Sequence, residues 1–397
     1  MREVAVGGVG MHPFGKFGEK PLIKMLVEVV NMALKDAQMD WSDIQGITAG
    51  SSHFSGGMGW GLTGNEVAQT MGRSGVPIYN LSAGCATGAN AFNVAYTLVG
   101  SGACDVVLAV AAEKMPKGFI PRTPGAPEDA SDVDYIRWKA IGIPNPGYWA
   151  LETRRRMEDF GTTELHLAKV SVKAHKVGAD NPMARYRKVF TLEDVLNSPM
   201  VNYPLRLFEI CAVSDGAAAA ILCSKNKIRQ KTTKPVWVAS STVATMQFGD
   251  PQIHGPEVAT TIPRPSALYN SEGTLAVRHA FEMGGIGPKD IDFIELQDNT
   301  ATHELMLPEL WGMCAPGECD RLVDQDQTYP SGKLPINPSG GFVSFGEATT
   351  VMGLFQVAQA VWQLRGEAGP RQVDGAKVGL LQALGLGGNG AATILKT

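Results

Sequence analysis

A cysteine within a segment of small residues is the first position that could do chemistry. Cys85 lies in Ser82–Gly88, directly before Ala86–Val99, a stretch typical of a tightly packed helix. Cysteine attacks as the thiolate, so a catalytic cysteine needs a nearby base, a lowered pKa, or both. The partial positive charge of a helix N-terminus would favour the thiolate. The segment predicts a nucleophile at Cys85, and a small buried side chain is the alternative.

A glutamate in a second glycine-rich segment is the candidate base. Glu347 follows Gly346 in Asn337–Ala348 and precedes a predicted helix over Thr349–Leu364. A carboxylate at a helix N-terminus is a stabilised anion and a poor base unless burial raises its pKa. With a raised pKa, Glu347 would accept a proton from a substrate hydroxyl. The alternative is a residue at the start of the helix with no chemical role.

Three polar residues follow a predicted strand, Phe293–Leu296. They are Gln297, Asp298 and Asn299, and strand ends are favoured places for sites in α/β proteins. Gln297 or Asn299 would donate hydrogen bonds to a developing enolate, and Asp298 would act as a base. The alternative for this triplet is a helix cap, with Asn299 or Thr300 as the cap residue.

A loop histidine and a pair of glycines are weaker candidates for the site, and no metal site is expected. His53 follows the second predicted strand and would approach Cys85, although a lone histidine in a loop is more often solvated. Gly387 and Gly388 lie in a glycine-rich turn near the end of the chain, which alone is weak support for a site. Cys314 and Cys319 have no histidine at a suitable spacing, so no metal site is expected.

Short strands alternate with amphipathic helices along the chain, which predicts an α/β fold. Both halves repeat this order, and Asp40–Ile44 and Pro288–Asp292 lie at matching points between a helix and a strand. We therefore predict a duplication, with a first half over residues 1–230 and a second half over 231–397. Residues 116–205 differ in composition and are predicted to be an insertion in the first half. The basic stretches of this insertion, Arg154–Arg156 and Lys169–Lys176, would meet an anionic ligand or form a solvated helix face.

Composition and charge exclude several classes of protein. The chain has 397 residues, of which 44% are hydrophobic and 19% charged, as in an ordinary globular protein. The net charge of −4 offers no basic excess for a nucleic acid. No apolar run is long enough to span a membrane, and no signal-peptide pattern follows Met1. We expect a cytoplasmic protein with reduced thiols.

Ordered motifs along nearly the whole chain resemble the thiolase superfamily, specifically the sterol-carrier-protein-2 (SCP-2) type of thiolase. The motifs are Cys85–Gly88, Ala112–Met115, Val213–Ala219, Asp290–Leu296, Leu334–Gly341, Gln363–Gly369 and Leu384–Gly388. The resemblance implies a duplicated five-layer αβαβα fold, a homodimer or a dimer of dimers, and coenzyme A thioesters as substrates, with no bound cofactor. It also implies that the Gly387 and Gly388 N–H groups lie near the thioester carbonyl. His53, Gly341 and Gly346 complete the predicted substrate-binding residues.

The chain departs from this family at two motifs. Where SCP-2-type thiolases have a His-Asp-Cys-Phe-like segment, this chain has Gln297–Thr300, and where they have Gly-His-Pro it has Gly346-Glu347-Ala348. The Gly-Glu-Ala version resembles the steroid side-chain aldolase branch, whose members work with a small DUF35-type OB-fold partner. That branch is thought to use tyrosines near these motifs, whereas this chain has Gln297 and Thr349 at the nearest positions.

Three functions remain open at this point. The first is retro-aldol cleavage of a β-hydroxyacyl-CoA with a steroid or lipid side chain, with Glu347 and Gln297–Asn299 as the catalytic groups and Cys85 lining the pocket. The second is an SCP-2-type acyltransferase that uses Cys85 as its nucleophile. The third is a non-catalytic acyl-CoA or lipid-binding subunit of a complex.

Overall fold

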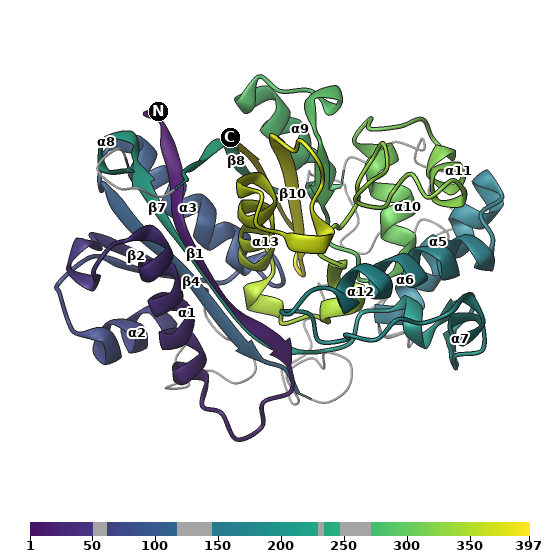
Figure 1. The fold of residues 1–397 in the computed structure, drawn as a ribbon, viewed down its shortest axis with the longest axis horizontal. Helices are drawn as coiled ribbons and strands as arrows, with labels where there is room; N and C mark the ends of the chain where they lie inside the picture. The colour runs from purple at the N-terminus through teal and green to yellow at the C-terminus, as the bar shows by residue number, and fades with distance from the viewer. Residues whose placement is uncertain (51–61, 117–144, 229–233, 247–270) are drawn as a thin grey trace, which may run out of the picture.

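The computed structural model describes residues 1–50, 62–116, 145–228, 234–246 and 271–397 (Figure 1). These residues form a nine-stranded sheet with the strand order β3-β2-β4-β7-β1-β8-β11-β10-β9. Its strands are β1 (Val4–Gly15), β2 (Gly46–Gly50), β3 (Ile78–Leu81), β4 (Val106–Lys114), β7 (Asp215–Ser224), β8 (Val236–Thr245), β9 (Phe293–Glu295), β10 (Val378–Gly385) and β11 (Asn389–Lys396).

The two halves of the chain build the same strand order. In the first half, the strands lie in the order β1, β7, β4, β2, β3 across the sheet, so the first strand neighbours the last one. In the second half, β8 neighbours β11, then β10, then β9. Beyond β9, a parallel bridge between Ile294 and Ile336 takes the position that β3 has beside β2 in the first half. The repeat supports the predicted duplication, while the predicted boundary at residue 230 lies outside the described residues.

The two half-sheets enclose a pair of helices, which gives five layers. The two half-sheets join at β1 and β8, where Ala5 pairs with Trp237 and Val6 with Val236. Helices α3 (Thr87–Ser101) and α13 (Leu354–Arg365) contact strands of both halves (Figure 1). Helices α1 (Leu22–Ala37) and α2 (Thr63–Met71) cover the outer face of the first half-sheet, and α9 (Glu272–Gly284) covers that of the second. This αβαβα order is the predicted architecture.

The central helices are packed on all sides because their residues are small or apolar. Ten residues of α13 between Leu354 and Leu364 are buried, which matches a helix enclosed between two sheets. The predicted helix over Thr349–Leu364 is interrupted, since a 3₁₀ turn, η4 (Thr349–Val351), precedes α13. Gly353 separates them with φ = +90°, and a Cβ there would lie 2.5 Å from the Ala89 backbone nitrogen on α3. This close approach requires glycine and places residues 347–352 against the start of α3.

The insertion packs against the second half of the chain. Its described elements are α5 (Asn145–Phe160), α6 (Glu164–Ala179), α7 (Leu192–Leu196), β5 (Met200–Asn202) and β6 (Leu205–Arg206). Helices α5 and α6 contact α10 (Ala301–Leu310), and α6 also contacts α11 (Glu318–Asp324) and α12 (Gly341–Phe345) (Figure 1). The remaining elements are α8 (Lys225–Ile228) and the 3₁₀ turns η1 (Trp41–Asp43), η2 (Leu207–Glu209), η3 (Pro288–Asp290) and η5 (Gly369–Arg371).

Most basic side chains of the two predicted basic stretches are paired with carboxylates of the protein itself, while Lys176 lies over the Tyr329 ring. Arg156 and Lys173 are buried in ion pairs with Glu309 and Glu304 of the second half. Lys169 forms a more exposed pair with Asp324. Arg156 and Lys173 therefore belong neither to an anion-binding site nor to a solvated helix face, because both side chains are buried in ion pairs that bind the insertion to α10. Among the described residues, none of the helices has the length and apolar character needed to cross a bilayer.

Candidate active site

Cys85 lies in a tight loop at the start of α3, against the turn that joins β10 to β11. The residue is 7% exposed. Gly84 has φ = +57°, and a Cβ at Gly84 would lie 2.5 Å from the Leu386 backbone nitrogen. Because Gly84 allows this approach, the Leu386 N–H donates a hydrogen bond to the Cys85 sulfur, which by itself lowers the pKa of the thiol. The predicted helix start behind Cys85 is therefore present, together with a second N–H donor from the closing turn.

Glu347 faces the Cys85 thiol from the segment between α12 and η4. Its backbone is fixed on both sides, because its N–H donates to Ala212 O at 2.6 Å and its carbonyl accepts from Ser214 N at 2.8 Å. Burial raises the pKa of the Glu347 carboxyl, while contacts with Cys85 and Asn299 lower it by less. Among the described residues, no group donates a well-aligned hydrogen bond to its Oε1 atom. The result is a buried carboxyl of raised pKa that contacts the Cys85 thiol and has one oxygen without a well-aligned donor among the described residues.

Asn299 and Gln297 extend from this carboxyl as a chain of hydrogen bonds. The Asn299 side-chain Nδ2 donates to Glu347 Oε2 at 3.3 Å. Asn299 Oδ1 accepts from Gln297 Nε2 at 2.9 Å, and Gln297 Oε1 accepts from the Leu384 N–H at 2.7 Å. Gln297 is thus engaged at both ends of its amide, and its effect on Glu347 is to orient Asn299.

Asp298 points away from this chain, toward the backbone of α12. Its carboxylate accepts hydrogen bonds from Phe342 N at 2.7 Å and Val343 N at 3.4 Å. Gly341 has φ = +64°, and a Cβ at this position would lie 2.6 Å from Asp298 Oδ1. Asp298 and Gly341 therefore fit together to hold the segment that leads to Glu347. The proposed base role of Asp298 gains no geometric support, and Gly341 has a local packing reason to be glycine.

Cys211 is a site residue that the sequence analysis missed. Its thiol accepts a hydrogen bond from Asn299 Nδ2 at 3.5 Å, and its N–H donates to Asn299 O at 2.9 Å. Burial and the charge of Glu347 raise the pKa of the Cys211 thiol. The available signal was its position two residues before the motif Val213–Ala219, which packs beside Glu347. A second sulfur thus lies next to Asn299, the residue that occupies the position of the family's cysteine.

The environment of Cys85 opposes the thiolate that its helix position favours. Burial and the neighbouring Glu347 carboxyl raise the pKa of the Cys85 thiol well above its usual range. These effects outweigh the Leu386 N–H, so the surroundings of Cys85 disfavour the thiolate, and a nucleophilic role for Cys85 stays a prediction. Of the histidines in the described ranges, none contributes to the pKa of Cys85. His53 lies outside the described residues.

Two of the predicted substrate-binding glycines lie in the turn beside Cys85. Gly387 and Gly388 have φ values of +86° and +75°, a backbone that favours glycine. Gly346, with φ = +74°, lies under Glu347, and a Cβ there would lie 2.6 Å from Ala212 O. Gly387 and Gly388 shape the turn that carries the Leu386 N–H. Gly346 sets the position of the Glu347 backbone.

Comparison with known proteins identifies the family. The family described as "Thiolase, N-terminal domain" matches residues 4–226, and the one described as "Thiolase C-terminal domain-like" matches residues 260–397. An acetyl-CoA acetyltransferase of Methanothermobacter thermautotrophicus is 36% identical over 399 residues, which cover 99% of this chain and 98% of that protein. Sterol carrier protein 2 of Homo sapiens is 35% identical over 415 residues, which cover 100% of this chain and 72% of that protein.

Solved structures share the fold along the full chain. The structure named "Ltp2-ChsH2(DUF35) aldolase" has a TM-score of 0.82 at 24% identity, covering 100% of this chain and 98% of that chain. Human mitochondrial 3-ketoacyl-CoA thiolase has a TM-score of 0.70 at 16% identity, covering 100% and 99%. Together with the sequence matches, the architecture shows that this chain belongs to the thiolase superfamily of enzymes.

Proposed function

We propose that this protein cleaves a β-hydroxyacyl-CoA by a retro-aldol reaction. The observation that carries the proposal is the Glu347 carboxyl, which is buried and has a raised pKa, and whose Oε1 receives no well-aligned hydrogen bond from the described residues. A base of this kind can take the proton of a β-hydroxyl that docks against Oε1. The acyl group fits the class of steroid or lipid side chains implied by the aldolase-like Gly346-Glu347-Ala348 motif.

The reaction balances without any group beyond the substrate and this chain. Glu347 takes the β-hydroxyl proton, the bond between Cα and Cβ breaks, and Cβ becomes the carbonyl carbon of a released aldehyde or ketone. The bonding electron pair moves to the thioester as an enolate. The proton held by Glu347 then passes to Cα, which gives the shortened acyl-CoA and restores the carboxylate. The Leu386 N–H beside Cys85 and the Asn299 Nδ2 beside Glu347 are the donors that we assign to the enolate oxygen.

Acyl transfer through Cys85 is the second candidate. Its support is the direct contact between Cys85 and Glu347, in which the carboxyl would accept the thiol proton as an acyl group arrives. The relatives named acetyl-CoA acetyltransferase favour the same chemistry. We rank it second because the raised pKa of Cys85 keeps the sulfur protonated, whereas retro-aldol cleavage requires no thiolate.

A partner protein and self-association are part of the proposal. The name of the aldolase neighbour includes a DUF35 component, and this supports a DUF35-type OB-fold partner for the present chain. A homodimer is the assembly proposed from the family resemblance. Co-expression with a DUF35 protein from the same genome, followed by size-exclusion chromatography with light scattering, tests both; a chain that elutes alone as a monomer contradicts both.

Turnover of matched substrates tests the reaction. The wild-type protein is expected to cleave a β-hydroxyacyl-CoA and to leave the corresponding β-ketoacyl-CoA with free CoA unchanged. Glu347→Gln keeps the size of the side chain and removes the base, so cleavage is expected to fall by about 10²–10⁴-fold. Thiolysis of the β-ketoacyl-CoA instead would support the acyltransferase, and tight binding of either thioester without turnover would support a binding subunit.

A further inference from the structure

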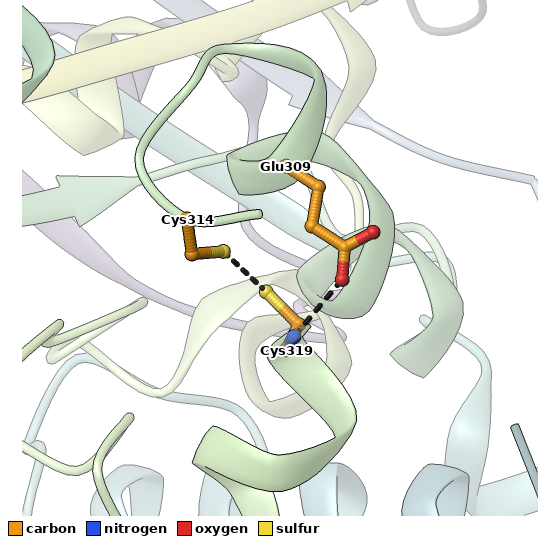
Figure 2. Close-up of side chains that lie close together, drawn as sticks. All are labelled: Glu309, Cys314 and Cys319. Carbon is orange, nitrogen blue, oxygen red and sulfur yellow. Dashed lines mark hydrogen bonds between the residues drawn. The ribbon is translucent and has the colours of Figure 1, made fainter. Parts of the chain in front are cut away.

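Two cysteines outside the candidate active site lie with their sulfurs in contact. Cys314 follows α10, and Cys319 lies in the first turn of α11 (Figure 2). Their Sγ atoms are 3.3 Å apart, and both side chains are free thiols. A disulfide holds its sulfurs at ~2.05 Å, so an approach of little more than ~1 Å would allow the bond. We propose that Cys314 and Cys319 form a reversible disulfide that joins α10 to α11.

A buried ion-pair frame holds the two thiols in this arrangement. Glu309 on α10 accepts a hydrogen bond from the Cys319 N–H at 2.9 Å (Figure 2). The two Glu309 oxygens also accept hydrogen bonds from the Arg156 guanidinium, at 2.8 and 2.9 Å. Arg156 in turn donates to Asp320, the neighbour of Cys319, at 2.8 Å. These contacts hold both ends of the loop and keep the two thiols in contact.

The same frame makes the cluster unsuitable for a metal ion. Glu309 is the third group near the two sulfurs that could serve as a ligand. Both of its oxygens are already bound to Arg156, and the fixed positive charge of that guanidinium repels a cation. Two thiolates on a tetrahedral zinc with bonds of ~2.3 Å lie about 3.8 Å apart, farther than these sulfurs. A disulfide adds no charge to the cluster and requires the sulfurs to move closer.

Thiol–disulfide exchange supplies the oxidation. The thiolate of Cys314, the more exposed of the pair, attacks a small-molecule disulfide, forms a mixed disulfide and releases one thiolate. Cys319 then loses its proton, attacks the Cys314 sulfur and expels the second thiolate. The protons of the two cysteines end on the two released thiols, so the pair loses two electrons and the small disulfide gains them. Contact with Cys314 and burial raise the pKa of Cys319, so the second step is expected to limit the rate.

Peptide mass measurements on the folded protein test the bond. The protein is incubated with oxidised and reduced glutathione at varied ratios, free thiols are alkylated, and trypsin releases Asp290–Arg321, which contains both cysteines. This peptide is expected to lose the mass of two hydrogen atoms, and dithiothreitol should restore them. A second cleavage after Glu318 separates the two cysteines, so the fragments stay together only where the disulfide exists.

Serine variants complete the test. Cys314→Ser and Cys319→Ser are each expected to abolish the loss of two hydrogens, and the partly exposed Cys314 provides a variant that disturbs the core least. Cys104→Ser, in the first half of the chain, is the matched control and should leave the bond intact. Cysteines that stay reduced, or that only take up one glutathione each, at every ratio would overturn the proposal. A stoichiometric zinc ion held by the pair in the purified protein would also overturn it.

Discussion

At the scale of single residues, the protein solvates the charged form of Glu347 poorly. Burial raises the pKa of this carboxyl, and among the described residues the hydrogen bonds from Cys85 and Asn299 lower it by less. A carboxyl whose pKa is higher in the folded state than in the unfolded state stabilises the fold most at low pH. That contribution disappears as the pH rises through the folded-state pKa. The residue proposed as the base is thus also a source of instability at neutral and alkaline pH.

Replacement of the carboxyl by an amide should therefore stabilise the protein. Glu347→Gln is expected to raise the free energy of unfolding by about 1 kcal/mol at pH 8 and to change it little at pH 4. Denaturant unfolding at the two pH values measures the difference. Glu19→Gln, an exposed glutamate, is the control and should show no such dependence. An equal effect of Glu347→Gln at both pH values would contradict a raised pKa.

Asn299 limits how far the pKa of Glu347 rises above its ordinary value. Its hydrogen bond to Glu347 Oε2 lowers the pKa of that carboxyl. Asn299→Ala removes the donor, so the midpoint of the pH–rate profile for cleavage should move to higher pH, and the rate at pH 6 should fall by about tenfold. Steady-state kinetics across pH checks this, with the exposed Asn197→Ala as the control. A fall in rate with no movement of the midpoint would show that Asn299 does not set the pKa of Glu347.

At the scale of elements, glycines between α12 and α13 decide where Glu347 lies. Gly346 adopts φ = +74°, and a Cβ there would lie 2.6 Å from Ala212 O, against the segment that leads into β7. Gly366, at the end of α13, adopts a similar φ of +76°, but a Cβ added there would meet no neighbouring atom within 4 Å. A side chain at Gly366 would therefore cause backbone strain alone, whereas a side chain at Gly346 would cause backbone strain and a steric clash.

The paired alanine variants make this separation measurable. Gly366→Ala should cost about 1–2 kcal/mol, the strain of a left-handed backbone. Gly346→Ala should cost a further ~1–3 kcal/mol because the site is already packed. Thermal and denaturant unfolding provide both values. If both variants lost the same free energy of unfolding, the atoms around Gly346 would be able to move aside, and their packing would not fix the Glu347 backbone.

At the scale of the whole molecule, buried ion pairs join the insertion to the second half. Lys173 on α6 is paired with Glu304 on α10 and also donates to Ile336 O at 2.8 Å. Asn337 Nδ2 donates to Glu304 at 3.2 Å, and Asn337 Oδ1 accepts from Leu296 N at 2.8 Å, next to the Gln297–Asn299 triplet. The insertion is thereby connected to the strand end that carries the candidate site.

Loss of one partner of the buried pair should be severe. Lys173→Met is expected to destabilise the protein by about 3–5 kcal/mol, because it leaves the Glu304 charge buried without its partner. Lys169→Met removes the more exposed pair with Asp324 on the same helix and should cost at most ~1 kcal/mol. Chemical denaturation compares them. The double variant Lys173→Met/Glu304→Gln should lose less free energy of unfolding than the sum of the two single variants. A loss equal to that sum would show that the two residues are not coupled.

Much of the fold follows from local sequence patterns, while the site depends on contacts that no local pattern reveals. The helix Leu22–Ala37 is predictable to the residue, because eight of its positions are buried at helical spacing. β1 extends to Gly15, beyond the apolar run Val4–Val9 that a local pattern would identify, since pairing with β7 continues through residues that carry no strand pattern. Cys211 and the orientation of Asp298 were missed, because both depend on packing between segments more than 40 residues apart.

Cleavage by a variant without the active-site sulfur tests the central claim most directly. Cys85→Ala is given a β-hydroxyacyl-CoA, the carbonyl product and the shortened acyl-CoA are quantified, and intact wild-type protein is weighed during turnover. We expect the variant to retain cleavage within about tenfold of wild type, and no acyl group to appear on Cys85 of the wild type. An acyl adduct on Cys85 in the wild type, with cleavage abolished in Cys85→Ala, would contradict it.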